Sequence, residues 1–185
     1  YRSLRRSGQE LLPHALESAK DPSAGVRSDV ALSMRNVSAR KAGPILAEIS
    51  MRYDGDDKNY VESIGLGSAG KESSIWQYLK GALNFSDPLK WNDSFAKITW
   101  RLGTKEAIND LCLRIKSENL STEDRLFAVE SIAFINHEDA PDALLDLGKD
   151  LENKKIQDAI THWILKRSLT SWNQYELNPK LKSSG

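Results

Sequence analysis

The sequence predicts an all-α protein, an irregular α-solenoid of stacked antiparallel helix pairs. Apolar residues recur at helical spacing along most of the 185 residues, and no segment alternates between apolar and polar residues as a strand would. The clearest stripe follows i, i+3, i+4, i+7 and i+8 at Ile75, Tyr78, Leu79, Ala82 and Leu83. Turn-forming residues interrupt the stripes at short intervals, which favours paired helices joined by short loops.

We expect helices at 1–19 (broken around Gly8), 23–36, 39–52, 57–66, 71–83, 92–102, 104–117, 122–136, 139–151 and 154–168, together one helical-repeat domain over 1–168. The last stretch, 169–185, is expected to be an extended tail or linker to a following domain. Stripes also support individual helices at Val26, Val30, Met34 and Val37, at Phe95, Ile98 and Leu102, at Ile108, Leu111, Cys112 and Ile115, at Leu144, Leu147 and Leu151, and at Ile156, Ile160, Trp163 and Ile164.

Capping residues stand where these helices should begin. Asp21-Pro22-Ser23 offers an N-cap oxygen from Asp21 and a proline in the first helical turn. Ser121 to Asp124 approximates a capping box. Asn59 has N-cap spacing to Glu62, although Asp56 or Asp57 could cap the same helix.

Composition excludes several classes of protein. No stretch approaches the roughly 18 to 20 uninterrupted apolar residues of a membrane-spanning helix, so no membrane insertion is expected. The single cysteine, Cys112, cannot form an internal disulfide. Because the chain begins at Tyr1 and no apolar segment follows, we expect no signal peptide and interpret the chain as a piece of a longer protein.

Charge is balanced in sum but unevenly distributed. Lys plus Arg and Asp plus Glu number 26 each, so the net charge of zero provides no bulk attraction for nucleic acid. The segment 105–153 has five basic and twelve acidic residues, a net charge of −7. Its carboxylates, represented by Asp139, Asp142 and Asp146, either form solvated helix faces or a docking surface for a basic partner.

Internal repetition is weak. Asp21-Pro22-Ser23-Ala24-Gly25-Val26-Arg27 followed by Val30-Ala31-Leu32 is the pattern with which the second helix of a HEAT repeat begins. In that pattern Val26 and Val30 face the neighbouring helix, and Arg27 reaches back to an acidic group or to carbonyls in the turn. Asp124-Arg125-Leu126 with Ala128-Val129 is a weaker copy.

Further motifs extend the resemblance. They are Tyr53-Asp54-Gly55-Asp56-Asp57, Tyr60-Val61-Glu62-Ser63-Ile64-Gly65, Gly70-Lys71-Glu72, Asp87-Pro88-Leu89-Lys90-Trp91 and Trp100-Arg101-Leu102. With these motifs the chain resembles the HEAT-like helical-repeat region of large exported proteins of planctomycete, verrucomicrobial and Bacteroidetes-type bacteria. Those proteins are described as membrane-bound dehydrogenases or CxxCH-type haem-binding proteins. The resemblance runs from about Tyr1 to about Lys182, and the Tyr-Asp-Gly segment is its most specific part.

The resemblance implies a context rather than an activity. In that family a β-propeller precedes the helical region and a c-type cytochrome domain follows, so it implies flanking domains as partners and an exported or periplasmic location. Haem attachment needs C-x-x-C-H, and Cys112 is followed by Leu113-Arg114-Ile115, so no covalent haem is expected. Lys58-Asn59 replaces the family's usual aromatic residue or arginine, which weakens any role based on that position.

Residues that could carry chemistry are few, and we expect no catalytic, cofactor-binding or metal-ligating residue. The three histidines, His14, His137 and His162, lack i, i+4 metal spacing, and Cys112 lies on an apolar stripe. Gly65-x-Gly67-x-x-Gly70 matches the dinucleotide fingerprint by letter but follows a predicted helix rather than a strand.

The loop 53–60 is the candidate for a local function. Asp54, Asp56 and Asp57 place three carboxylates in four residues between Tyr53 and Tyr60, although the order of an EF-hand is absent. Helix capping and solvation of the loop explain the same residues without a ligand.

Five tryptophans raise the rival prediction of a helical-repeat DNA glycosylase. Such an enzyme normally needs a basic stripe for phosphates, which the acidic segment opposes. We expect Trp76 and Trp163 in buried helix seams and Trp91 with Trp100 at the start of a helix. The favoured function is a non-catalytic scaffold within a larger protein; a free-standing protein-binding scaffold is the alternative in the same class.

Overall fold

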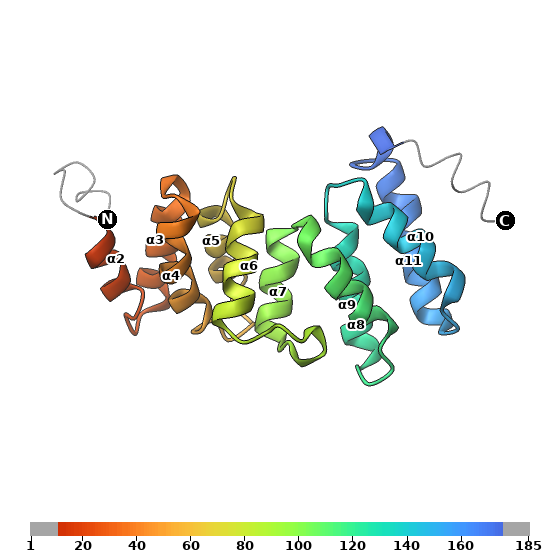
Figure 1. The fold of residues 1–185 in the computed structure, drawn as a ribbon, viewed down its shortest axis with the longest axis horizontal. Helices are drawn as coiled ribbons and strands as arrows, with labels where there is room; N and C mark the ends of the chain where they lie inside the picture. Colours follow the sequence, from red (N-terminus) through yellow and green to blue (C-terminus); the bar gives the residue numbers. More distant parts are fainter. Residues whose placement is uncertain (1–10, 176–185) are drawn as a thin grey trace. The chain divides into compact units, whose positions relative to one another are not determined.

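The protein is all-α, with helices packed on one another in a helical-repeat arrangement. The computed structural model describes residues 11–175, and within this range every regular element is helical. The predicted fold class is confirmed. The α-helices are α2 (Leu11–Ser18), α3 (Ala24–Ser33), α4 (Ala39–Ser50), α5 (Lys58–Gly67), α6 (Glu72–Ala82), α7 (Asp93–Leu102), α8 (Ile108–Lys116), α9 (Thr122–Ala133), α10 (Asp139–Asp150) and α11 (Lys154–Ser168). Figure 1 shows their order along the chain.

Four short 3₁₀ helices accompany them in the described range: η1 (Met34–Asn36), η2 (Pro88–Lys90), η3 (Lys105–Ala107) and η4 (Asn173–Tyr175). The chain divides into two compact units. The first comprises Tyr1–Asp87 and Trp91–Leu102, and the second comprises Pro88–Lys90 and Gly103–Gly185. The helix expected before residue 11 lies outside the described residues.

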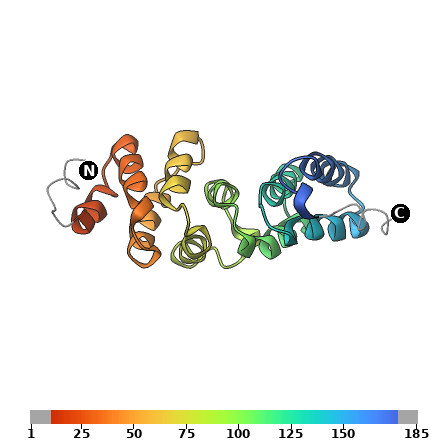
Figure 2. The same ribbon diagram turned by 90° about the horizontal axis from the view of Figure 1, so that it is seen from above.

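In the first unit each helix packs mainly on the helix two places along the chain. Helix α3 packs on α5, and α4 packs on α6, so the helices form two layers, which Figure 2 shows end-on. Helix α7 continues the stack against α5 and α6. The seam between the layers is apolar and includes the buried side chains of Val30, Leu46, Ile49, Ile64, Ile75, Leu79 and Phe95.

In the second unit, helices that follow one another in the chain also pack closely, α8 on α9 and α10 on α11. Helix α9 packs on α8 and α11, and α10 packs on α8, α9 and α11. Helix α8 also holds η2, because the buried Arg114 donates from Nη1 to the carbonyl oxygen of Pro88 at 2.6 Å. The core includes Leu111, Ile115, Val129, Ile132, Leu144, Ile156, Ile160 and Ile164.

Residues 169–175, expected in the extended tail, instead form turns and η4. Trp172 is fully buried, and its indole Nε1 donates to the carbonyl oxygen of Ile135 at 3.0 Å. This side chain adds to the core of the second unit after its last long helix has ended. The remaining tail, 176–185, lies outside the described residues.

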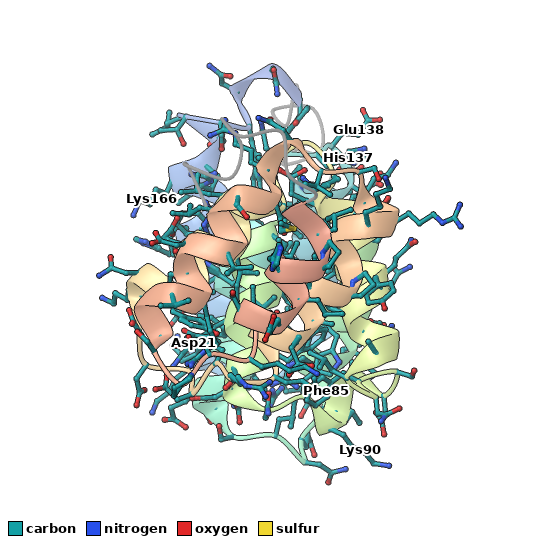
Figure 3. All side chains as sticks on the ribbon, turned by 90° about the vertical axis from the view of Figure 1, so that its left-hand side faces the viewer. Asp21, Phe85, Lys90, His137, Glu138 and Lys166 are labelled. Atoms are coloured by element: carbon teal, nitrogen blue, oxygen red, sulfur yellow. The ribbon has the colours of Figure 1, made fainter. Side chains whose placement is uncertain are left out.

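The structure confirms the predicted cap of α9, has Asp57, the alternative to Asn59, as the cap of α5, and differs from the prediction at α3. Ser121 caps α9 by accepting from the Asp124 N–H, as expected. The cap of α3 was wrongly predicted, because that helix begins at Ala24 and both Asp21 and Pro22 precede it. Asp21 lies in the turn between α2 and α3 (Figure 3), where its Oδ1 accepts from the Ser23 N–H at 2.7 Å and forms an Asx turn.

Candidate functional site

The loop that joins α4 to α5 brings Tyr53 and Tyr60 together as a stacked pair. Their ring centroids are 5.7 Å apart and their planes differ by 6°. The Tyr53 hydroxyl donates to the carbonyl oxygen of Gly55 at 3.0 Å, and the Tyr60 hydroxyl donates to that of Ile49 at 2.9 Å. Lys97 from α7 also donates to Gly55, at 2.8 Å. These contacts join the loop and the start of α5 to α4, through Ile49, and to α7, through Lys97.

Two of the three loop carboxylates accept hydrogen bonds from backbone N–H groups, and the three do not converge on one point. Asp57 caps α5, accepting from the N–H groups of Asn59 at 2.9 Å and Tyr60 at 3.2 Å. Asp54 accepts from the Asp56 N–H at 2.9 Å in an Asx turn, and Asp56 itself is exposed. Within residues 11–175 no group of three or more His, Cys, Asp or Glu side chains could hold a metal ion. The structure therefore assigns this loop a capping and turn-forming role.

Proton affinities in the loop follow from these positions. Burial, with a smaller effect from the Asp54 charge, raises the pKa of Tyr53 to about 12. Burial also raises the pKa of Tyr60, although the hydrogen bond from Arg27 opposes the rise. The N–H of Asp56 lowers the pKa of Asp54, because it stabilises the carboxylate.

Arg27 connects the start of α3 to the stacked tyrosines. Its Nη1 donates to the carbonyl oxygens of Asp21 at 2.7 Å and Pro22 at 2.9 Å, which confirms the prediction that it reaches back to carbonyls in the turn. Its Nε donates to the Tyr60 hydroxyl at 2.8 Å. Arg27, which belongs to the repeat motif, therefore joins the turn before α3 to Tyr60 of α5.

The glycines of the dinucleotide-like motif have packing roles. A Cβ on Gly67 would lie 2.1 Å from the carbonyl oxygen of Ala31, so this glycine allows α5 to approach α3. A Cβ on Gly65 would lie 2.4 Å from the Arg101 guanidinium carbon. Gly70 has φ +76° after the helix has ended. All three glycines are explained by helix packing and termination.

The cysteine and the histidines lie on separate helices or turns. Cys112 is partly buried in α8, and burial raises the pKa of its thiol. His14 lies in α2, and His162 lies on the exposed side of α11. His137 precedes α10 (Figure 3) and accepts at Nδ1 from the Asp139 N–H at 3.3 Å.

Three of the five tryptophans are buried, namely Trp76, Trp91 and Trp172, while Trp100 and Trp163 are partly exposed. Trp76 donates from Nε1 to the Thr99 hydroxyl at 3.1 Å inside the first unit. The expectation that Trp163 is buried is wrong. It packs edge-on against Phe134 at 5.4 Å, with the Lys166 ammonium 4.7 Å from its ring centroid.

The predicted acidic residues of the second unit share one face of α10. Asp139, Asp142 and Asp146 are spaced i, i+3 and i+7, and the side chains of Asp139 and Asp146 are 62% and 78% exposed. The opposite face is buried through Ala140, Leu144 and Leu147. Asp146 pairs with Lys149 at 3.0 Å. We call Asp139, Asp142 and Asp146 the acidic face.

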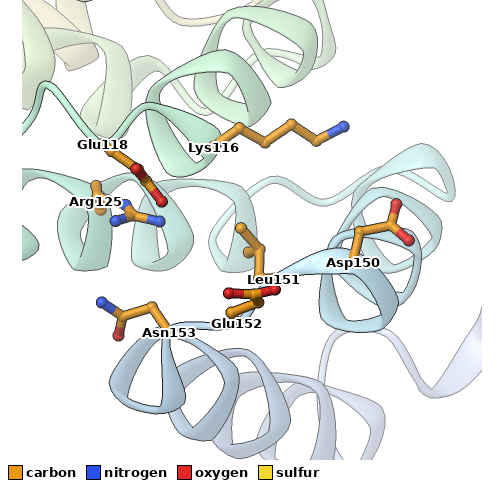
Figure 4. A pocket seen from close by; sticks show the side chains of 7 residues that line it. All are labelled: Lys116, Glu118, Arg125, Asp150, Leu151, Glu152 and Asn153. Carbon is orange, nitrogen blue, oxygen red and sulfur yellow. The ribbon is translucent and has the colours of Figure 1, made fainter.

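A cavity that the sequence did not predict lies in the second unit, at the turns α8–α9 and α10–α11. Its volume is about 680 Å³, and Figure 4 shows the side chains that line it: Lys116, Glu118, Arg125, Asp150, Leu151, Glu152 and Asn153. Residues from two loops separated by some 30 positions meet only after folding. The one sequence signal was the weak copy of the repeat motif that contains Arg125.

Comparison with protein-family profiles, curated proteins and solved structures finds no match. No helix among the described residues has both the length and the apolar character that crossing a bilayer requires. The geometry of the chain itself therefore carries the functional argument.

Proposed function

We propose that this chain is a non-catalytic docking module of the HEAT type within a larger exported protein. The observation that carries the proposal is the acidic face of α10. It places three carboxylates on the solvent side of a helix whose other side is buried. The resemblance to the helical region of CxxCH-type proteins suggests the parent's c-type cytochrome domain as the basic partner.

The packing of the helices supports a scaffold role. In the first unit each helix packs mainly on the helix two places along the chain, and in the second unit α9 packs on both α8 and α11, so the helices of each unit are stacked with exposed outer faces. The residues that could have indicated catalysis or ligand binding have structural roles instead. Asp57 caps a helix, Gly67 admits a neighbouring backbone, and burial raises the pKa of Cys112 and so disfavours its thiolate.

Titration calorimetry with the cytochrome domain supplied in trans tests the proposal. We expect weak binding at 0.1 M salt and its loss at 1 M, because the Debye length falls from about 10 Å to about 3 Å. Reversal of the acidic face by Asp139→Lys, Asp142→Lys and Asp146→Lys should weaken binding at least about tenfold, since each exposed pair contributes about 0.2–1 kcal/mol and reversal adds repulsion.

The matched control is a triple reversal with the same change in net charge on exposed acids of the first unit, Glu17→Lys, Asp29→Lys and Asp56→Lys. This control should bind like the parent chain. Binding that is absent at low salt, or that weakens equally in both triple variants, would contradict docking at the acidic face.

A further inference from the structure

The cavity at the turns of the second unit contains an unusual arginine. Arg125 is only 7% exposed, and its Nε donates to the carbonyl oxygen of Ile115 at 2.8 Å. Its two terminal nitrogens, Nη1 and Nη2, have no hydrogen-bond or ion-pair partner in the described part of the chain. Both terminal nitrogens keep contact with solvent at the cavity, so they are open to a ligand that supplies an acceptor.

The corresponding arginine of the first unit shows the difference. Arg27 is the fourth residue of α3, as Arg125 is the fourth residue of α9. Arg27 uses its terminal nitrogen for the carbonyl oxygens of Asp21 and Pro22. The terminal nitrogen of the arginine at this position therefore has carbonyl partners within the first unit, whereas the terminal nitrogens of its counterpart in the second unit face a cavity.

The other charges of the cavity define what could enter. Lys116 adds a second cation, which is exposed, and helix α11, 15 residues long, begins at the cavity wall with Asn153 as its cap. Three carboxylates, Glu118, Asp150 and Glu152, complete the wall and form no ion pair with another described residue. Figure 4 shows Arg125 and Glu118 on one side of the cavity and Glu152 and Asp150 farther along it.

This mixture of charges selects against a polyanion. A nucleic acid or polyphosphate would meet three carboxylates for two cations. A single carboxylate can accept both terminal N–H groups of a guanidinium, and a neighbouring cation can then pair with the acidic wall. The volume of about 680 Å³ lies within the usual range for a bound small ligand or a short peptide end.

We propose that this cavity binds the end of a basic peptide, with its terminal carboxylate on Arg125 and its cationic side chains against Glu118 and Glu152. This inference deepens the proposed function and rests on it, since it assumes that the module binds another protein. It adds a second contact to the same unit, separate from the acidic face of α10.

The test is an NMR titration of the isotope-labelled 185-residue chain with the peptide acetyl-Gly-Lys-Gly-Lys-Ala bearing a free carboxylate. We expect saturable shifts of backbone amides that cluster at residues 116–118, 125 and 151–153, with millimolar affinity. The amidated peptide, which lacks the carboxylate, and acetyl-Gly-Gly-Gly-Gly-Ala, which lacks the cations, should each bind at least about fivefold more weakly.

Variants of the cavity provide the second arm. Arg125→Lys keeps a donor for Ile115 but loses the two-pronged terminus, so the affinity for the free-carboxylate peptide should fall about tenfold. Should that variant fold poorly, the exposed pair Glu118→Gln and Glu152→Gln is expected to weaken binding about three- to tenfold. Arg40→Lys, on the exposed side of α4, is the matched control and should leave the affinity unchanged.

Equal binding of the free and amidated peptides, shifts that occur elsewhere, or indifference to the Glu118 and Glu152 changes would each overturn the cavity proposal. Its failure is distinguishable from failure of the docking function. Reversal of the acidic face should weaken docking and spare peptide binding, whereas Arg125→Lys should weaken peptide binding and spare docking.

Discussion

Replacing Gly67 by alanine tests the close packing of α3 on α5. The added Cβ would lie 2.1 Å from the carbonyl oxygen of Ala31, whereas ordinary contact begins at about 3.4 Å, so the two helices must separate locally by about 1.3 Å. Backbone is the obstacle, and no rotamer change can relieve it. Overpacking of this kind costs about 3 kcal/mol, of which alanine's higher helix propensity recovers about 1 kcal/mol.

The net loss of about 2 kcal/mol corresponds to a midpoint roughly 4–8 °C lower in a thermal melt followed by circular dichroism. Gly81→Ala is the matched control in α6, because a Cβ there has no atom within 4 Å. We expect that control to raise stability by about 0.5–1 kcal/mol. If Gly67→Ala melts at or above the midpoint of Gly81→Ala, the inferred contact between α3 and α5 is wrong.

Three other predictions concern the first unit. Val30→Asp should lower the free energy of unfolding by several kcal/mol in chemical denaturation, because Val30 is fully buried. Val26→Asp should cost clearly less, because Val26 is only partly buried. Equal effects would refute the assigned face of α3. Asp57→Ala should lower the free energy of unfolding by about 1 kcal/mol through loss of the α5 cap, whereas Asp56→Ala should leave it unchanged. The same denaturation assay compares them, and an Asp57→Ala variant as stable as the parent chain would contradict the capping geometry. Tyr53 should ionise near pH 12 in ultraviolet titration of the folded chain. Because the unfolded tyrosine loses its proton near pH 10, the stability that comes from this raised pKa is present below pH 10 and is lost as the pH rises toward 12. Tyr53→Phe should remove that part of the pH dependence of stability.

Local patterns in the sequence predicted the helices well because each depends on residues close together in the chain. The helix predicted from the stripe Ile75 to Leu83 is present as α6, although Tyr78 and Ala82 of that stripe are exposed, and the cap at Ser121 is present as predicted. Asp21 shows the limit of such reasoning. Its oxygen serves an Asx turn two residues before the helix, and sequence alone does not distinguish that turn from an N-cap.

The candidate sites depended more on tertiary structure. Whether Asp54, Asp56 and Asp57 converge is decided by the turn geometry, and the backbone N–H groups claim two of them. The cavity could not be predicted, because it forms where two turns distant in sequence meet around Arg125. The different hydrogen bonding of Arg27 and Arg125 likewise arises from the neighbouring turns, which short motifs do not encode.

The burial of Trp172 has a practical consequence for where the chain can be shortened. A chain that ends at Ser168, with all of α11 intact, would lack the indole that donates to the Ile135 carbonyl oxygen. The apolar surface that this indole covers would then be exposed to solvent. The thermodynamic boundary of the second unit therefore lies beyond its last long helix. Recombinant work on this module should keep the chain at least through Tyr175, the end of η4, or accept a product prone to self-association through an uncovered end.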